Sequence, residues 1–496
     1  MSWFDDRLSH RHRIAVSTLS QTGGNLAVAL IGVGIIRITT NQLGPANYGL
    51  FALIITYVSL FTLITDLGIT AMTNRELGRQ GADQSVILST AMSSRVGLSI
   101  AVIPLIVGSS LLIYRGHAAI FTVAMAVMAS DVVWKSIQTV SGTAFTVRLK
   151  GHTVSGMLLV NRGLYLLGVI AVALAHGTYV DYVASYVAAD LVVAMVLLVL
   201  VHRVVPLRWT FDLPSWWQAI RIAVPLGIMQ VIANIYAWVD SVMVSILRSS
   251  TELAYYSLAF NAVNVLSVLP GFLMVALMPT IVNAEPHEVE RLVGRAMYVL
   301  VCVGGVLGVG AIVLSRPIVL LMAGASFTPA RVPLIVLACT IPLGFAQTVI
   351  SYACVTLNQY RPLIMVAFMV LLLNVVMNCV MIPTWGPTGA AITLLCTELI
   401  SLLGTWRVFS RLTGLRVAFD ELWRPGLAMV GALGAGIVAL VLLRGARPIW
   451  TFVIDGSLIS AIYVACLSLA RGVPEELPLP RVIRRWVHPS SSPRSE

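Results

Sequence analysis

Apolar runs of bilayer-spanning length recur along almost the whole chain, and this feature restricts the fold more than any other. A helix needs roughly 20 apolar residues to cross the hydrocarbon layer, and the sequence holds about 14 such runs on that criterion. Only helices and closed barrels satisfy their backbone polar groups in lipid, and these runs lack the alternation of barrel strands. The sequence therefore predicts an all-α polytopic membrane protein.

The distribution of charge supports this class and predicts an orientation. Only 11% of the residues are charged, whereas a soluble domain carries about 25%. With the N-terminus inside, most of the 32 Lys and Arg residues fall on the inner side, as the positive-inside rule requires. We expect a multi-pass cell-membrane protein with cytoplasmic N- and C-termini. No basic folded domain is present that would predict a nucleic-acid partner.

The two halves of the sequence resemble each other at a single offset of 208 residues. Residues 46–50 align with 254–258, Leu149 aligns with Leu357, and Asp190 aligns with Glu398. Because six is an even number of crossings, a duplicated six-helix unit gives two parallel repeats, an arrangement known in transporters. The prediction is an N-lobe of residues 1–205, a C-lobe of 206–411, a two-helix extension of 412–471 and a cytoplasmic tail of 472–496.

The chain carries no motif that predicts an enzyme, a metal site or a cofactor. Its six cysteines lie in apolar runs without a C-x-x-C pair, and they are expected to be buried hydrophobes. No Walker, GxGxxG or nucleophile-elbow context is present, and the expected outer loops are short. We therefore predict no catalytic residues. A membrane glycosyltransferase or polymerase stays as the non-transport alternative.

Four ionisable residues lie near the middle of the expected spans: Asp131, Lys135, Asp190 and Glu398. A charge at that depth costs about 2.5–3.5 kcal/mol on insertion scales, so it suggests function. Asp131, Lys135 and Gln138 share one helix face, where Asp131 and Lys135 either neutralise each other or line a polar cavity. Asp190 and Glu398 either bind a coupling proton or sodium ion or bridge helices. Together with Asp240, the three acids of this group are the candidate ion-coupling residues.

Neutral polar side chains form two stripes in the seventh and eighth expected spans. Gln230 and Asn234 are spaced i, i+4, and Asn261 and Asn264 are spaced i, i+3. Each stripe either binds sugar hydroxyls or joins neighbouring helices.

Three segments carry a family resemblance. They are Leu43-Gly44-Pro45-Ala46-Asn47-Tyr48-Gly49, Leu320-Leu321-Met322-Ala323-Gly324 with Ser326-Phe327, and Ile382-Pro383-Thr384-Trp385-Gly386-Pro387-Thr388-Gly389-Ala390-Ala391. Gly386 and Gly389 suit a tight turn or close helix contact, and Pro387 suits the first turn of a helix. The segments resemble motifs of the polysaccharide transporter (Wzx-type flippase) branch of the multidrug/oligosaccharidyl-lipid/polysaccharide exporter superfamily.

That resemblance implies two six-helix lobes, in this branch with a two-helix extension, and alternating access. The implied substrate is a polyprenyl-diphosphate-linked oligosaccharide, flipped from the inner to the outer leaflet. A diphosphate calls for Arg and Lys donors, so Arg37 and Lys135, then Arg95 and Arg162, become the candidate cavity ligands. Membrane lipid is a further partner, with a polysaccharide polymerase or glycosyltransferases as candidate protein partners. An ion-coupled multidrug exporter and a peptidoglycan-precursor flippase of the same superfamily remain alternatives.

Overall fold

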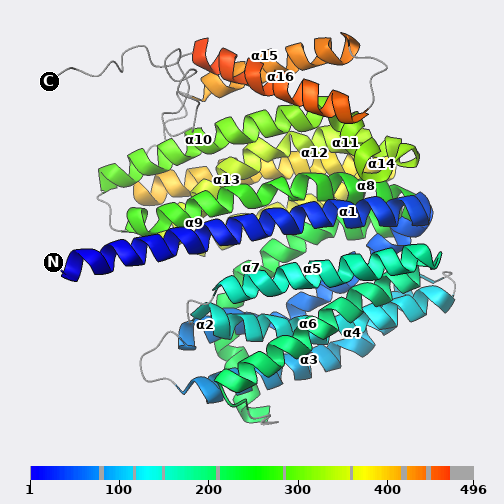
Figure 1. Ribbon diagram of the computed structural model, residues 1–496, viewed down its shortest axis with the longest axis vertical. Coiled ribbons are helices and arrows are strands. Elements are labelled where there is room, and N and C mark those ends of the chain that lie inside the picture. Colours follow the sequence, from blue (N-terminus) through cyan, green and yellow to red (C-terminus); the bar gives the residue numbers. More distant parts are fainter. Residues whose placement is uncertain are drawn as a thin grey trace. The chain divides into compact units, whose positions relative to one another are not determined.

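The computed structural model describes residues 2–77, 83–115, 119–147, 151–207, 213–282, 286–357, 361–414, 422–442 and 448–469. All regular structure in this described part is helical (Figure 1). Nine of its helices are long and apolar enough to cross a membrane, and three shorter helices are also apolar. The helices are α1 (Ser2–Asp66), α2 (Ile69–Leu77), α3 (Gln84–Ile113), α4 (Ala119–Val147), α5 (Gly151–Leu174), α6 (Tyr179–Val204), α7 (Leu213–Leu247), α8 (Ser250–Asn264), α9 (Leu269–Val282), α10 (Pro286–Val313), α11 (Ser315–Ala323), α12 (Arg331–Ala338), α13 (Thr340–Thr356), α14 (Arg361–Thr413), α15 (Trp423–Leu442) and α16 (Pro448–Leu469), with 3₁₀ turns η1 (Leu266–Val268) and η2 (Ala325–Ala330).

Two of these helices, α1 and α14, each consist of two crossings joined at a glycine. Gly44 in α1 has φ 66° and Gly386 in α14 has φ 56°, values that break the helical path and favour glycine. We count each half as one crossing, and we count α8 with α9, and α12 with α13, as one crossing each. The described chain then holds the fourteen crossing helices that the sequence predicted.

The glycine motif of α14 brings two segments of backbone into close contact. A Cβ at Gly389 would lie 2.0 Å from the carbonyl oxygen of Met381, so only glycine allows the two halves of α14 to approach this closely. Pro387 directly follows the break at Gly386, where the second half of α14 begins. The expected tight turn and close contact in this motif are confirmed.

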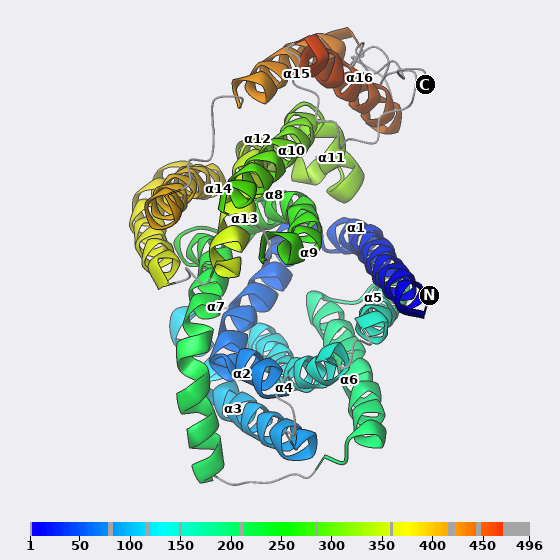
Figure 2. The same ribbon diagram turned by 90° about the vertical axis from the view of Figure 1, so that its left-hand side faces the viewer.

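The chain forms two compact units, here named the first and the second unit. The first comprises Met1–Ser257 with Met322–Ser326, and the second comprises Leu258–Leu321 with Phe327–Glu496. In the first unit α7 packs against α1, α2 and α3 (Figure 2). In the second unit α15 and α16 pack side by side and against α10 (Figure 1). The lobe boundaries expected from the repeat stay a prediction, because these units are defined by packing.

Helix α4 packs against several helices of the first unit. Its neighbours are α3 and α6, and also α1 and α5. Met125, Ala129 and Val132 on α4 are completely buried. The polar side chains of Asp131 and Ser136, on the same helix, are also buried inside the first unit.

Candidate functional site

The most concentrated group of charges in the first unit surrounds Lys135 on α4. Its Nζ lies 2.5 Å from the hydroxyl of Tyr186, 3.4 Å from Asp131 Oδ2 and 3.7 Å from Asp190 Oδ2. The ammonium also lies 4.8 Å from the centre of the Tyr186 ring, within cation–π range. These residues come from the middle of α4 and α6, and with Gln138, Asn161, Arg162 and Tyr165 we name them the α4–α6 polar cluster.

The two carboxylates of the cluster differ in their hydrogen-bond donors. Asp190 Oδ1 accepts from Asn161 Nδ2 at 2.7 Å and from Gln138 Nε2 at 3.0 Å. Asp131 is 1% exposed, and its Oδ1 has no hydrogen-bond partner among the described residues. The Asp190 carboxyl group is therefore hydrogen-bonded by two amides, whereas Asp131 depends on the nearby ammonium.

Lys135 is the open member of the cluster. Its side chain is 35% exposed, against 1% for Asp131 and 7% for Asp190. Arg162, on α5, acts electrostatically on both Tyr165 and Tyr186, whose rings meet edge to face at 5.1 Å. Two cations thus act on one tyrosine, and the side chain of one of them, Lys135 in the middle of α4, is partly exposed.

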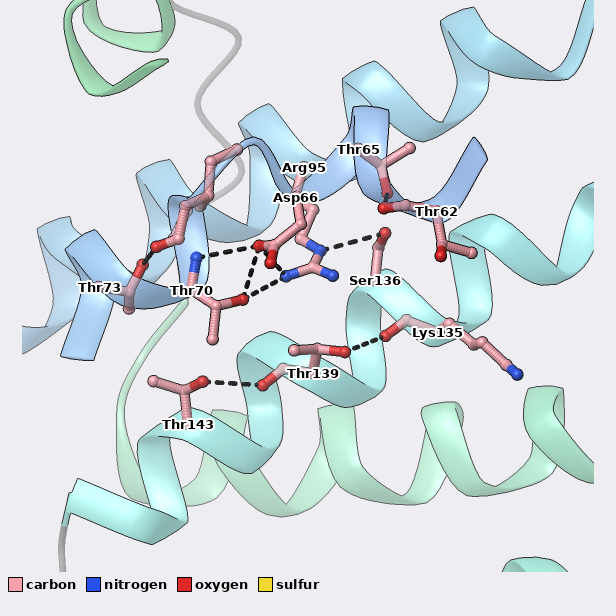
Figure 3. Close-up of polar contacts among 12 residues, drawn as sticks. Thr62, Thr65, Asp66, Thr70, Thr73, Arg95, Lys135, Ser136, Thr139 and Thr143 are labelled. Atoms are coloured by element: carbon pink, nitrogen blue, oxygen red, sulfur yellow. Dashed lines mark hydrogen bonds and ion pairs between the residues drawn. The ribbon is translucent and has the colours of Figure 1, made fainter. Parts of the chain in front are cut away.

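Arg95, another predicted cavity ligand, belongs to a separate and closed group. Its Nη1 donates to Asp66 Oδ1 at 2.7 Å and to Thr70 Oγ1, and its Nε donates to Ser136 Oγ at 3.4 Å. Asp66 Oδ1 also accepts from the Thr70 hydroxyl and backbone N–H. Figure 3 shows these side chains converging, while the amine of Lys135 points away from them. With 6% of Arg95 exposed, its guanidinium joins α1, α2, α3 and α4.

The position of Asp66 follows from a break in the chain. After α1 ends at Asp66, Leu67 and Gly68 adopt φ of 37° and 86°, and α2 then begins. A Cβ at Gly68 would lie 2.6 Å from Gly227 N on α7, so the break is also a close backbone contact. The Arg95 pair fixes this turn where it meets α7.

Arg37 lies near the end of the first half of α1, seven residues before the break at Gly44. A Cβ at Gly324 would lie 3.5 Å from Arg37 Nη1 and 3.2 Å from Asn41 Oδ1. Thr40 Oγ1 donates to the carbonyl of Met322 at 3.3 Å. The second motif segment therefore packs onto this end of α1, and Arg37 is partly buried beside it.

The remaining predicted site residues lie outside the cluster. Asp240 is buried on α7 and accepts a hydrogen bond from Tyr256 at 3.1 Å, which joins α7 to α8. Asn234 is partly buried on α7, and the side chain of Gln230 lies outside the described residues. Asn261, Asn264 and Glu398 belong to the second unit: Asn261 and Glu398 are partly buried, and Asn264 is exposed.

Sequence reasoning missed several polar residues. Asp66 sits at the end of an apolar run, and Asn161 and Tyr186 have no charge to mark them. In the second unit, Asn378 Nδ2 donates to Asn374 Oδ1 at 2.9 Å, and Asn374 and Thr397 are completely buried between the halves of α14. The i, i+4 spacing of Asn374 and Asn378 inside an apolar run was a readable signal for a helix contact.

Two further features limit what the described part of the chain can bind. No group of three or more His, Cys, Asp or Glu side chains is placed there to hold a metal ion. A cavity of about 480 Å³ lies between α1, α3 and α7, bordered by Tyr57, Ser109 and apolar side chains such as Ile235. Its lining suits hydrocarbon, so a charged group is better accommodated at the α4–α6 polar cluster.

Comparisons with known proteins agree on family and fold. The family described as "Polysaccharide biosynthesis protein" matches residues 14–285, more than half of the chain, and the MatE family matches residues 225–380. No curated protein sequence matches.

Solved structures with a similar fold include a lipid II flippase, MurJ, in an inward closed conformation. It has a TM-score of 0.74 and 14% identity over 90% of this chain and 98% of that one. An inward-facing MATE multidrug transporter of the MOP superfamily has a TM-score of 0.61 and 11% identity over 80% and 98%. A mutant of the Vibrio cholerae MATE transporter VcmN has a TM-score of 0.55 and 11% identity over 82% and 97%.

Proposed function

This chain belongs to the polysaccharide biosynthesis protein family and is a multi-pass membrane transporter of the multidrug/oligosaccharidyl-lipid/polysaccharide superfamily, and we propose that its substrate is a polyprenyl-diphosphate-linked oligosaccharide. The substrate is flipped from the inner to the outer leaflet by alternating access. The head group occupies a polar space inside the protein while the polyprenyl tail stays in hydrocarbon. In this proposal the termini are cytoplasmic, because the basic residues favour the inner side.

The observation that carries the proposal is a partly exposed lysine side chain, that of Lys135, in the middle of an apolar helix of spanning length. An isolated cation there is costly, and such residues in membrane proteins face the interior or a water-filled space. A diphosphate that binds beside Lys135 loses contacts with water. It gains contacts with the Lys135 ammonium and with the nearby guanidinium of Arg162, both suited to phosphate oxygens. Tyr186 holds the Lys135 ammonium in place through its hydroxyl and ring.

Arg37 remains a candidate ligand, at a different depth from Lys135. It lies beside Gly324 and Asn41, near the end of a crossing, where a long side chain can reach the head-group region. We assign Arg95 a positioning role, because its donors are already engaged with Asp66, Thr70 and Ser136.

Flipping of a fluorescent polyprenyl-diphosphate sugar in proteoliposomes tests the proposal. Lys135→Ala should reduce the rate at least tenfold, because the head group loses a charge-assisted contact worth about 1.5–3 kcal/mol. Arg248→Ala is the matched control, since Arg248 pairs with Glu252 at a half-exposed helix end and such pairs contribute little. If Lys135→Ala flipped the sugar at the wild-type rate, Lys135 would not be a ligand of the head group.

A multidrug exporter is the second candidate, and the buried carboxylates Asp131 and Asp190 favour it, because a cationic drug would pair with them. The MatE match to residues 225–380 points the same way. Lipid II is a third candidate substrate, given the fold shared with a lipid II flippase. Efflux of an organic cation, together with no flipping of either lipid-linked sugar, would replace the proposed substrate with a drug. Faster flipping of lipid II would replace it with the peptidoglycan precursor.

A further inference from the structure

Among the described residues, Lys135 is the one cation of the α4–α6 polar cluster within 4 Å of its two carboxylates, Asp131 and Asp190, whereas Arg162 acts on the tyrosines. Lys135 contributes one positive charge, and Asp131 and Asp190 contribute two negative charges when both are ionised. Both acids are buried, at 1% and 5% exposed. Two carboxylates that share a site disfavour double ionisation, and the one ammonium between them offsets only one of them.

The two acids differ in their hydrogen-bond donors. This difference shows which of them depends on Lys135 to offset its charge. Asp190 accepts hydrogen bonds from Asn161 and Gln138, two amide donors that do not depend on Lys135. Asp131 Oδ1 has no partner among the described residues, and its Oδ2 is 3.4 Å from Lys135 Nζ. Asp190 also acts electrostatically on Asp131, so each carboxylate makes a second negative charge beside Lys135 less favourable.

We infer that Asp131 is a proton-binding site, and that it takes up one proton when Lys135 binds the diphosphate of the substrate. This inference rests on the proposed function, because Lys135 must be a head-group ligand. The incoming diphosphate brings negative charge to the cation that is paired with Asp131. One proton from bulk water then bonds to a carboxyl oxygen of Asp131 and converts –COO⁻ to –COOH, while Asp190 keeps its hydrogen bonds to Asn161 and Gln138.

The consequence is that proton and substrate bind together rather than in exchange. Binding equilibria are reciprocal, so if the diphosphate favours the protonated acid, protonation favours the diphosphate by the same factor. Deprotonation of Asp131 would in turn restore its pairing with Lys135 and weaken the hold on the head group. Asp131 is therefore a candidate release trigger.

The charged and titratable groups around Asp131 come from three helices. They are Lys135 on α4, Asp190 and Tyr186 on α6, and Arg162 and Tyr165 on α5. On α3, Arg95 is paired with Asp66 at 2.7 Å.

Calorimetric titration of the full-length protein in lipid nanodiscs with farnesyl diphosphate tests the inference. The same titration in phosphate and in Tris at one pH gives the number of protons taken up per ligand. Wild type should take up about one proton more than Asp131→Asn, because the amide cannot titrate. The ligand's own change in protonation is common to both and cancels. Asp190→Asn is the matched variant and should keep the uptake.

The outcomes separate the inference from the proposed function. Equal uptake by wild type and Asp131→Asn, with binding intact, would overturn the inference and leave head-group binding in place. No binding by wild type would overturn both. Should Asp131→Asn not fold, the wild-type affinity decides: it should rise as pH falls, by up to tenfold per pH unit. Protonation of the ligand alone would lower the affinity, so an unchanged or falling affinity would refute the inference.

Discussion

Replacement of Arg95 by Met separates structural cations from substrate ligands in the first unit. The guanidinium is 2.7 Å from Asp66 and is 6% exposed. Removal of one partner of a buried ion pair costs about 3–5 kcal/mol, because the other charge is left uncompensated. Asp66 keeps two hydrogen bonds from Thr70, at 2.7 and 3.1 Å, and its side chain is 24% exposed. We therefore expect the lower end, about 3 kcal/mol.

The double variant Asp66→Asn/Arg95→Met tests whether the pair itself causes this cost. With both charges removed, no ion is left in the turn, and replacement of a buried pair by neutral groups is often close to neutral. We expect it to recover about 2 kcal/mol relative to Arg95→Met. Unfolding of the full chain in mixed detergent micelles, followed by circular dichroism, measures each free energy. Arg248→Met is the control, expected within about 1 kcal/mol of wild type.

The opposite result would be informative for the site. Arg95→Met could have a free energy of unfolding within about 1 kcal/mol of wild type and yet abolish flipping of the lipid-linked sugar. The contact with Asp66 would then not be the main role of Arg95. Arg95 would then be a head-group ligand, as the sequence alone suggested.

Further substitutions test the contacts that shape the bundle. Gly389→Ala should lower the free energy of unfolding by about 1–3 kcal/mol, because its Cβ would lie 2.0 Å from the Met381 carbonyl. Gly44→Ala meets nothing within 4 Å but has φ 66°, so only backbone strain of about 1–2 kcal/mol is expected. Tyr256→Phe should cost about 1–3 kcal/mol by removing the hydroxyl that donates to buried Asp240. Micellar unfolding measures all three. Wild-type stability of Gly389→Ala would contradict the expected clash, and wild-type stability of Gly44→Ala would contradict the expected strain.

The membrane fold could be predicted because it depends on the length and apolarity of the spans, which can be read directly from the sequence. The glycine motifs were informative for a similar reason. Gly44 and Gly386 adopt φ values that only glycine adopts readily, so their presence marks turns between crossings. Interruptions of other kinds were harder to recognise. The positive φ at Leu67 has no residue-type signal, and the α1–α2 turn that orients Asp66 could not be located from the sequence.

The candidate site was predictable only within a single helix. The Asp131–Lys135 pair follows from i, i+4 spacing, and the structure confirms it at 3.4 Å. Asp190 joins the same ammonium from α6, and Asn161 joins Asp190 from α5. These contacts depend on helix rotation and packing, which apolar patterning in lipid specifies weakly because small and apolar residues occur on every face.

The internal repeat predicts equivalent positions for Asp190 and Glu398, yet their surroundings differ. Asp190 is buried among amide donors and shares Lys135 with Asp131. Glu398 is only partly buried on α14, whereas its neighbour Thr397 is fully buried and lies against Asn374. The second unit thus turns an uncharged side chain inward at the place where the first unit turns an acid. A proton-binding role that had been duplicated would require a buried acid in both copies, and Glu398 is less buried than Asp190. We therefore expect proton uptake to stay with Asp131 in the first unit, and Glu398→Gln should leave the proton uptake of the wild type unchanged.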